Sequence, residues 1–363
     1  MTHALGQYRR RTALLGAVTC LLSVMLLAVP ASGEAAVSRS FFGVQDWSTP
    51  DRTTFDRLAG ARVGVLRANL SWRSVEPSAG ARSWAGYDQL VAGAARARME
   101  VLPVLLGSPA FAAARAQHPP RAGSMGGWTS FVADAVRRYG PGGSFWAANP
   151  TLAYRPIRKW QVWNEPSLPV YWSGRPNARS YVRFLSRTRT SIKGVDRRAK
   201  IVLAGLPETK RGVSMQRYLQ GIYRARGRRL FDVVAIHPYA RDQRGVEAAV
   251  VRTRRTMRRY RDRRKTLWLT EIGWATGGRK IGGTRPFITN SRGQATRLSR
   301  TARRLLRTRR RYRIGMMVWF ALRDRLPVSG EPNWWAIHTG LFDRFGKPKR
   351  SWGTFSGFTR KTR

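Results

Sequence analysis

The sequence predicts a (β/α)8 barrel, a parallel α/β fold, and three observations support this prediction. From residue 40 onward, short apolar runs rich in β-forming residues alternate with longer amphipathic runs. The short runs lack the strict alternation of a strand with one exposed face, so each is expected to be buried on both faces of a parallel sheet. Eight such units span about 320 residues, which fits a barrel with insertions.

Taken in order, the eight strand–helix units form one domain over residues 38–360, without an internal repeat or a linker that would release a second domain. An open doubly wound sheet is the structural alternative, but no Gly-x-Gly-x-x-Gly fingerprint or phosphate loop follows the first strand. Strands are expected over 41–45, 62–67, 101–106, 159–164, 201–204, 233–236, 266–271 and 316–320. Helices are expected over 50–59, 87–98, 127–139, 178–193, 215–225, 246–260, 291–309 and 351–358.

The first residues resemble an export signal rather than part of the fold. Three consecutive arginines at 9–11 precede an apolar run over 13–29, and small residues follow at 30–33. This layout predicts a signal peptide over residues 1–33, with an uncleaved membrane anchor as the alternative. The protein is therefore expected to be secreted, or tethered to the outer face of the cell membrane. Cys20, the single cysteine, lies in the apolar run, so the mature chain would have no disulfide and no cysteine-bound metal.

The chain is strongly basic, with a net charge of +49. Arginine is dense over 252–264 and 300–313, where the expected helices place apolar residues on the opposite face. One interpretation is attraction to a polyanion, such as an anionic cell-wall polymer; the other is a solvated outer face in an arginine-rich protein. We expect unspecific binding to anionic polymers at low salt, no specific nucleic acid partner, and a monomer.

Two of the expected strands end on a glutamate. The run Lys159-Trp160-Gln161-Val162-Trp163-Asn164-Glu165-Pro166 is stopped by a proline, and the run Thr266-Leu267-Trp268-Leu269-Thr270-Glu271-Ile272-Gly273-Trp274 is followed by a glycine. The carboxyl ends of parallel strands are where barrel proteins carry their chemistry, so Glu165 and Glu271 are expected to face one cleft. A carboxylate pair can cleave a glycosidic bond without a metal or cofactor.

No metal and no cofactor is predicted. The four histidines, at positions 3, 118, 237 and 338, are scattered without the spacing of metal ligands.

The two strand-end motifs together resemble those of the retaining glycoside hydrolases of clan A, which are built on a (β/α)8 barrel. The chain is most similar to the extracellular glycosidases of families 39 and 5. Further pieces match in order along nearly the whole mature chain: Glu76-Pro77, Ser108-Pro109, Ala235-Ile236-His237-Pro238-Tyr239, Trp319-Phe320 and Gly340-Leu341.

The resemblance implies a role for each matching residue. Glu165 would be the general acid/base and Glu271 the nucleophile of a double displacement. Asn164 would bind the 2-hydroxyl of the sugar, and Arg67 would keep Glu271 ionised. The residues implied to line the substrate site are His237 and Tyr239, near the nucleophile, and Trp319, as the apolar floor under a sugar ring.

Two other functions remain open on the sequence alone. One is a catalytically weak barrel that binds glycans, and the other is a basic protein that binds cell-wall or other polyanions. The sequence does not specify the sugar, the linkage, or endo versus exo cleavage, because these depend on the loops after the strands.

Overall fold

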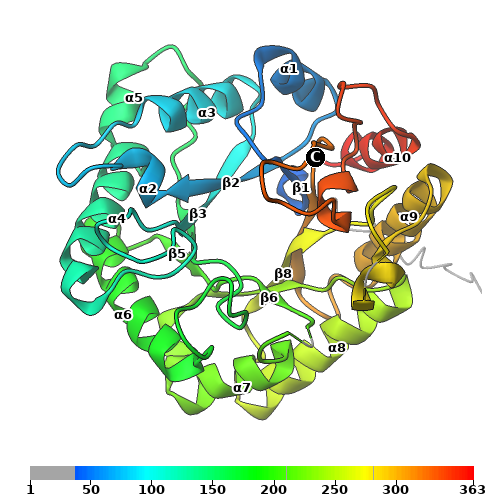
Figure 1. Cartoon of the computed structure of the whole chain (residues 1–363). Helices are drawn as coiled ribbons and strands as arrows, with labels where there is room; N and C mark the ends of the chain where they lie inside the picture. Colours follow the sequence, from blue (N-terminus) through cyan, green and yellow to red (C-terminus); the bar gives the residue numbers. More distant parts are fainter. Residues whose placement is uncertain (1–36, 210, 281) are drawn as a thin grey trace, which may run out of the picture. The chain divides into compact units, whose positions relative to one another are not determined.

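The computed structural model describes residues 37–209, 211–280 and 282–363, which form a closed parallel barrel (Figure 1). The predicted signal peptide lies outside the described residues. Every strand pairs in parallel with its neighbours, and β5 pairs with both β4 and β7, so the sheet has no free edge. The predicted (β/α)8 fold is thus confirmed. The strands are β1 Phe42–Gln45, β2 Val65–Ser71, β3 Glu100–Leu106, β4 Lys159–Val162, β5 Lys200–Val202, β6 Leu206–Pro207, β7 Val233–His237, β8 Thr266–Ile272 and β9 Ile314–Phe320.

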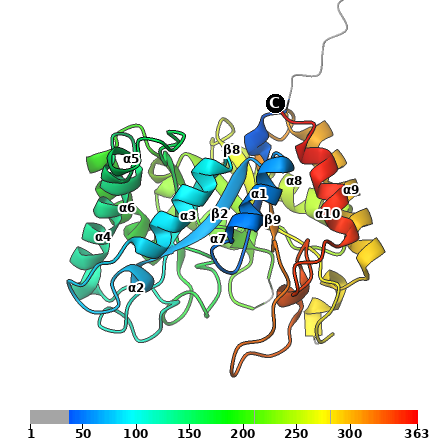
Figure 2. The same ribbon diagram turned by 90° about the horizontal axis from the view of Figure 1, so that it is seen from above.

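The helices form a ring outside the barrel (Figures 1 and 2). Asp51, Asn177, Asp242 and Asn290 each accept a backbone N–H hydrogen bond at the start of a helix, which fixes where α1, α6, α8 and α9 begin. The α-helices are α1 Arg52–Gly60, α2 Trp72–Val75, α3 Ala85–Arg96, α4 Met125–Tyr139, α5 Ser144–Ala148, α6 Ala178–Val195, α7 Met215–Arg224, α8 Gln243–Arg259, α9 Ser291–Thr308 and α10 Arg350–Thr359. Short 3-10 helices are η1 Arg39–Phe41, η2 Ala122–Ser124, η3 Gly227–Leu230, η4 Gly282–Phe287 and η5 Trp335–His338.

No described helix combines the length and apolar character needed to cross a membrane.

The two-residue period of the strands separates the core into two parts. One set of side chains packs between the sheet and the helices, and it includes Trp160, Trp319 and Phe355. The other set fills the inside of the barrel with apolar side chains: Val65, Leu102, Val202, Val233, Ala235, Trp268, Met316 and Val318. At the carboxyl ends of the strands this inner filling becomes polar: Gln45, Arg67, Gln161, His237 and Thr270 are all buried there. The apolar plug therefore supports a buried polar layer.

Two irregularities of the barrel lie close to the carboxyl ends of the strands, and neither was predicted. The fifth strand is broken between β5 and β6, and Gly205 lies in the break. In β8, Leu269 pairs with Met317 of β9 and Ile272 pairs with Trp319, so β8 takes three steps where β9 takes two. That extra residue is a β-bulge, a feature that re-aims side chains near active sites. Both irregularities lie next to the polar layer.

Candidate active site

Glu165 is aimed by an unusual backbone at the end of β4. Trp163 has φ +72° and Glu165 has φ +41°, a left-handed conformation that costs free energy for residues other than glycine. The chain turns sharply here, so the carboxylate of Glu165 points toward the barrel axis instead of continuing the strand. Its Oε1 lies 2.7 Å from Nδ1 of His237. The left-handed backbone therefore brings the first glutamate into the polar layer.

Glu271 reaches the same layer because of the bulge in β8. The bulge lets Thr270 and Glu271 both point inward, although adjacent residues of a regular strand point to opposite faces. Oε1 of Glu271 lies 2.6 Å from Nη1 of Arg67, and Tyr239 donates its hydroxyl to Oε2 at 2.9 Å. Glu271 is 8% exposed, so this carboxylate is held from two sides in a mostly dry environment.

Arg67 connects the ends of β4 and β8, which carry the two glutamates. Its side chain is fully buried, and its Nε donates to Oε1 of Gln161 at 2.8 Å. Nη1 also donates to Oε1 of Gln45, and Nη2 donates to Oδ1 of Asn164 at 2.9 Å. The guanidinium thus binds four residues from the ends of three strands, β1, β4 and β8, and it fixes Glu271 relative to Asn164. Gln45 and Gln161 were not predicted as part of the site.

His237 is held between the two glutamates. Its Nε2 lies 3.1 Å from Oγ1 of Thr270, and its Nδ1 lies 3.5 Å from Oε2 of Glu271 as well as near Glu165. The ring packs directly on the broken fifth strand: a Cβ at Gly205 would lie 1.9 Å from Nε2. Only glycine leaves room for the imidazole there, so Gly205 in the break allows His237 to lie between the two glutamates.

The two carboxyl groups differ in their electrostatic surroundings. Burial raises the pKa of Glu165, and the charge of Glu271 adds to this, while the hydrogen bond and the electrostatic interaction with His237 oppose it. Burial would also raise the pKa of Glu271, but the electrostatic interactions with His237 and Arg67, with hydrogen bonds from Arg67 and Tyr239, lower it overall. Glu165 therefore tends to hold its proton while Glu271 is ionised.

The pair opens into a cleft of about 930 Å³ at the carboxyl end of the barrel. The loops after β8 and β9 supply an aromatic wall, in which Trp335 packs against Tyr239 and Phe287 with ring centroids 4.8 and 5.0 Å apart. Asp46, whose pKa burial raises to about 6, also faces the cleft. The cleft-lining residues include Trp47, Asn69, Asn164, Glu165, Tyr171, Glu208, Tyr239, Glu271, Phe287, Phe320, Trp334 and Trp335.

The structure corrects one predicted substrate contact. Trp319 was expected to form the floor under a sugar ring, but its side chain is fully buried and its Nε1 donates to the carbonyl of Thr339 at 3.0 Å. It belongs to the packing between sheet and helices, against Trp274. Because side chains alternate along β9, the next residue, Phe320, points to the cleft instead and packs against Trp47.

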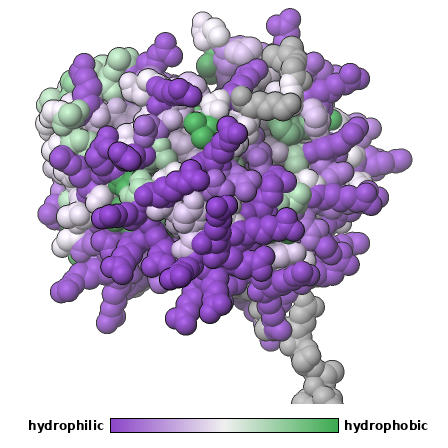
Figure 3. Space-filling model, turned by 90° about the horizontal axis from the view of Figure 1, so that it is seen from below, coloured by the Kyte–Doolittle hydropathy of each residue, from purple (hydrophilic) through white to green (hydrophobic). Residues whose placement is uncertain are grey.

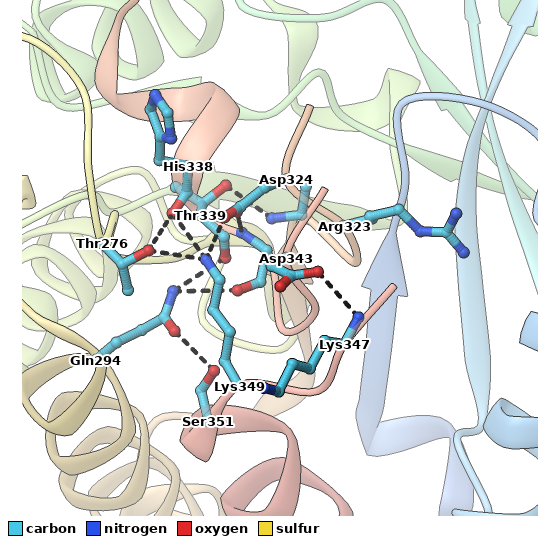
Figure 4. A network of polar contacts seen from close by, with 12 residues as sticks. Thr276, Gln294, Arg323, Asp324, His338, Thr339, Asp343, Lys347, Lys349 and Ser351 are labelled. Atoms are coloured by element: carbon cyan, nitrogen blue, oxygen red, sulfur yellow. Dashed lines mark hydrogen bonds and ion pairs between the residues drawn. The ribbon is translucent and has the colours of Figure 1, made fainter. Parts of the chain in front are cut away.

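A partly buried polar network anchors the loop that carries Trp334 and Trp335 (Figure 4). Lys349 Nζ forms an ion pair with Asp324 at 2.5 Å and donates to Thr276 Oγ1 at 2.8 Å, which joins the loops after β9 and β8. Gln294 of α9 donates to the carbonyl of Thr339 at 3.2 Å. Burial lowers the pKa of Lys349 and raises that of Asp324, as expected for an ion pair enclosed by protein. These contacts thus hold the loop with Trp334 and Trp335 in place at the edge of the cleft.

Glu165, His237 and Glu271 offer oxygen and nitrogen atoms that lie within 4.8 Å of one another, a spacing that a metal ion could use. Arg67 argues against a cation at this position, because its guanidinium already places a positive charge 2.6 Å from Glu271. The prediction of a site without metal stays a prediction, supported by this charge.

The described chain is therefore a closed parallel (β/α)8 barrel with glutamates at the carboxyl ends of β4 and β8. No family model matches the chain, and no curated protein matches it in sequence. Among solved structures, a family 39 glycoside hydrolase from Bacteroides cellulosilyticus WH2 is similar, with a TM-score of 0.63 and 20% identity over 89% of this chain. The match covers 64% of that protein, so this chain spans less than two thirds of its length.

Two further structures have the same fold. One is a family 5 glycoside hydrolase variant from Bifidobacterium longum subsp. longum, in complex with Manβ1-4GlcNAc (TM-score 0.65, 14% identity, 88% of this chain and 78% of that one). The other is native xylanase 10B from Thermotoga maritima (TM-score 0.59, 14% identity, 89% of this chain and 95% of that one). At these identities the similarity establishes the fold, and it confirms the resemblance to families 39 and 5 at that level.

Proposed function

We propose that the protein is a retaining glycoside hydrolase that acts on an oligosaccharide or polysaccharide by double displacement. The observation that carries this proposal is the pair formed by Glu165 and Glu271. Their oxygens come within 4.8 Å of each other, and their pKa values are shifted in opposite directions. Retaining enzymes place the two carboxyl groups about 5–5.5 Å apart, whereas inverting enzymes need about 6.5–9.5 Å to admit a water.

The proposed mechanism assigns one chemical role to each carboxyl group. Glu271, kept ionised by Arg67 and Tyr239, attacks the anomeric carbon. Glu165, which holds its proton, donates it to the leaving oxygen. Once Glu271 is esterified by the sugar its negative charge is gone, so the pKa of Glu165 falls and the group can deprotonate the incoming water.

The neighbouring residues orient these two groups and the substrate. Asn164, whose Oδ1 is held by Arg67, would bind the sugar 2-hydroxyl with its fixed amide. His237 would hold Glu165 in place through the 2.7 Å contact at Nδ1. The aromatic side chains that line the cleft, among them Trp334 and Trp335, can pack against the apolar face of a sugar ring.

The stereochemistry of the product tests the mechanism directly. Purified protein would be screened on a panel of activated aryl glycosides, and the first-formed anomer of the active one followed by ¹H NMR. We expect the product to retain the anomeric configuration. An inverted product would contradict the double displacement, and a lack of turnover on every glycoside, together with saturable glycan binding, would favour the catalytically weak binding barrel.

The location of the protein is a separate proposal that rests on the N-terminal sequence alone. The arginine–apolar–small residue order over 9–33 supports export, followed by release or retention at the outer face of the membrane. Cell fractionation with N-terminal sequencing of the mature protein tests it. A cytoplasmic, full-length protein would contradict export.

A further inference from the structure

A pocket lined almost wholly by arginine lies at the end of the barrel opposite to the cleft. It is formed by the C-terminal part of α8, the turn before β8 and the turn before β9, and its volume is about 270 Å³. These segments lead into the strands, so they lie at the amino end of the barrel, whereas Glu165 and Glu271 lie at the carboxyl end. Six of the eight lining residues are arginines: Arg254, Arg255, Arg258, Arg263, Arg311 and Arg313, beside Val251 and Tyr312.

Arg254 is buried in this arginine pocket, with 6% of its surface exposed. Its Nη1 donates to the carbonyl of Lys265 at 2.9 Å, which fixes the guanidinium. Burial, and then the charge of Arg313, lower the pKa of Arg254 to about 10. Asp262 attracts Arg254, but its carboxylate is 3.0 Å from Lys265 and accepts the hydroxyl of Tyr223. The pocket thus concentrates positive charge around a cation that is already desolvated.

Three other arginines at the rim have no hydrogen-bonding or ion-pair partner among the described residues. Within the described residues, the guanidiniums of Arg255, Arg258 and Arg263 make no hydrogen bond and no ion pair, and no acidic residue lines the pocket. Two nearby arginines, by contrast, are paired with carboxylates: Arg252 of α8 with Glu208, and Arg304 of α9 with Glu247. Unpaired donors that converge on one hollow are available to an external anion.

Positive charge alone does not distinguish this pocket. Figure 3 shows that hydrophilic side chains crowd the face of the molecule seen from below, the side on which α7 and α8 lie in Figure 1. The arginine pocket differs because it is concave, because Arg254 is buried in it, and because it contains no carboxylate. A solvated surface arginine requires none of these features.

We propose that the arginine pocket binds an anion that carries more than one phosphate group. A guanidinium presents two parallel N–H donors that match a pair of oxyanion oxygens. Each phosphate group offers about three acceptor oxygens and up to two negative charges, so several arginines can share it, whereas a carboxylate offers two oxygens and one charge. The pocket has the volume of about nine water molecules at roughly 30 Å³ each, which exceeds the needs of a single phosphate.

The arginine pocket shares no residue with the candidate active site. A bound phosphate-bearing anion would therefore leave the cleft open at the other end of the barrel. Substitutions in the pocket are expected to weaken anion binding without changing the hydrolysis of a small neutral glycoside.

Isothermal titration calorimetry with inorganic tripolyphosphate, at constant ionic strength, tests the proposal. The pocket variant is Arg258→Gln with Arg263→Gln, and the matched control is Arg183→Gln with Arg187→Gln. The control residues are exposed, unpaired arginines of α6, so both variants lose the same charge. We expect the pocket variant to bind tripolyphosphate at least about tenfold more weakly, and the control to change less than about twofold, since only the first loses charge-assisted hydrogen bonds.

The outcomes separate a specific site from general charge. Equal weakening in both variants, or no saturable binding by the wild type, would overturn the proposal. Displacement of tripolyphosphate by polygalacturonate at equal anion concentration would overturn the preference for phosphate. A single-stranded oligonucleotide added as competitor identifies the source: displacement indicates a phosphodiester chain, and no displacement indicates a free oligophosphate.

Unfolding temperatures establish that each variant is folded. Arg255→Gln alone provides a milder substitution for the same measurement if the double variant is unstable.

Discussion

The ends of β4 and β8 place the same residue type at the same edge of the barrel, yet they give its carboxylate opposite properties. Glu165 follows a left-handed turn and meets only His237 directly, so burial dominates and its pKa is raised. Glu271 follows a bulge and lies near His237, Arg67 and Tyr239, so electrostatic interactions and donated hydrogen bonds outweigh burial and its pKa is lowered. The comparison shows that the partners, more than burial or residue type, decide which carboxyl group has the raised pKa and which the lowered one.

The largest expected effect is at the nucleophile. Glu271→Ala should lower kcat by on the order of 10⁵-fold or more, because the covalent route is lost while the acid remains. Steady-state hydrolysis of an aryl glycoside measures this, with Glu208→Ala, a glutamate of the cleft rim that pairs with Arg252, as control. Comparable losses in both variants would mean that Glu271 has no special role.

The next effect is at the acid/base. Glu165→Ala should lower kcat/KM by on the order of 10²–10⁴-fold for a poor leaving group, because no proton reaches the departing oxygen. With a dinitrophenyl glycoside, whose leaving group departs without a proton, the first step should be nearly unaffected. The ratio of the two losses is the measurement, and a ratio near one would assign Glu165 another role.

Arg67→Met removes a cation and a hydrogen bond that lower the pKa of Glu271. The pKa of Glu271 should rise, so the acidic limb of the kcat/KM profile should move to higher pH, with a loss near neutral pH of about 10–100-fold. Unfolding should become easier by about 3–5 kcal/mol, because a buried carboxylate loses its partner. An unchanged acidic limb in the pH–rate profile would show that Arg67 does not control Glu271.

The same substitution has a consequence for stability against pH. The pKa of Glu271 is lowered in the folded protein, so its ionised form stabilises the fold above the unfolded pKa, and this contribution is lost as pH falls through the folded pKa. Arg67→Met should remove part of that acid sensitivity. Denaturant unfolding of both proteins between about pH 3 and 7 compares the slopes.

The smallest effect is expected from Tyr239→Phe. This change removes one hydrogen bond to Oε2 of Glu271 but leaves the ion pair with Arg67. A decrease in kcat/KM of about tenfold, with a small upward shift of the acidic limb, follows from the loss of one charge-assisted bond. A loss as large as that of Arg67→Met would mean that Tyr239 contributes more than a hydrogen bond.

Much of the fold and the positions of the two glutamates could be predicted, because strand ends are marked locally. Pro166 stops the fourth strand, and the apolar runs before Glu165 and Glu271 have the composition of buried strands. The parallel barrel then places both ends on one edge. The structure also brings Arg67, Asn164, His237 and Tyr239 together around the glutamates, as the family resemblance implied.

The remaining features depend on long-range pairing that no local pattern reports. Gln45 and Gln161 look like ordinary strand residues, and only the closed barrel shows that both bind Arg67. The difference between Trp319 and Phe320 depends on which residue of β9 faces inward, a choice set by register. The break at Gly205 is recognisable only once the imidazole of His237 lies against it.

Because of the bulge in β8, the position and contacts of Glu271 depend on the number of residues in this strand and not on the length of the loops. Deleting Thr270 would restore regular pairing, but it would also move Glu271 to the position of Thr270 and remove the hydroxyl that contacts His237. The aromatic loops after β8 and β9, by contrast, can change length or sequence without moving either carboxylate. The loops at the rim can thus vary in sequence and length, whereas the number of residues in β8 has to stay the same.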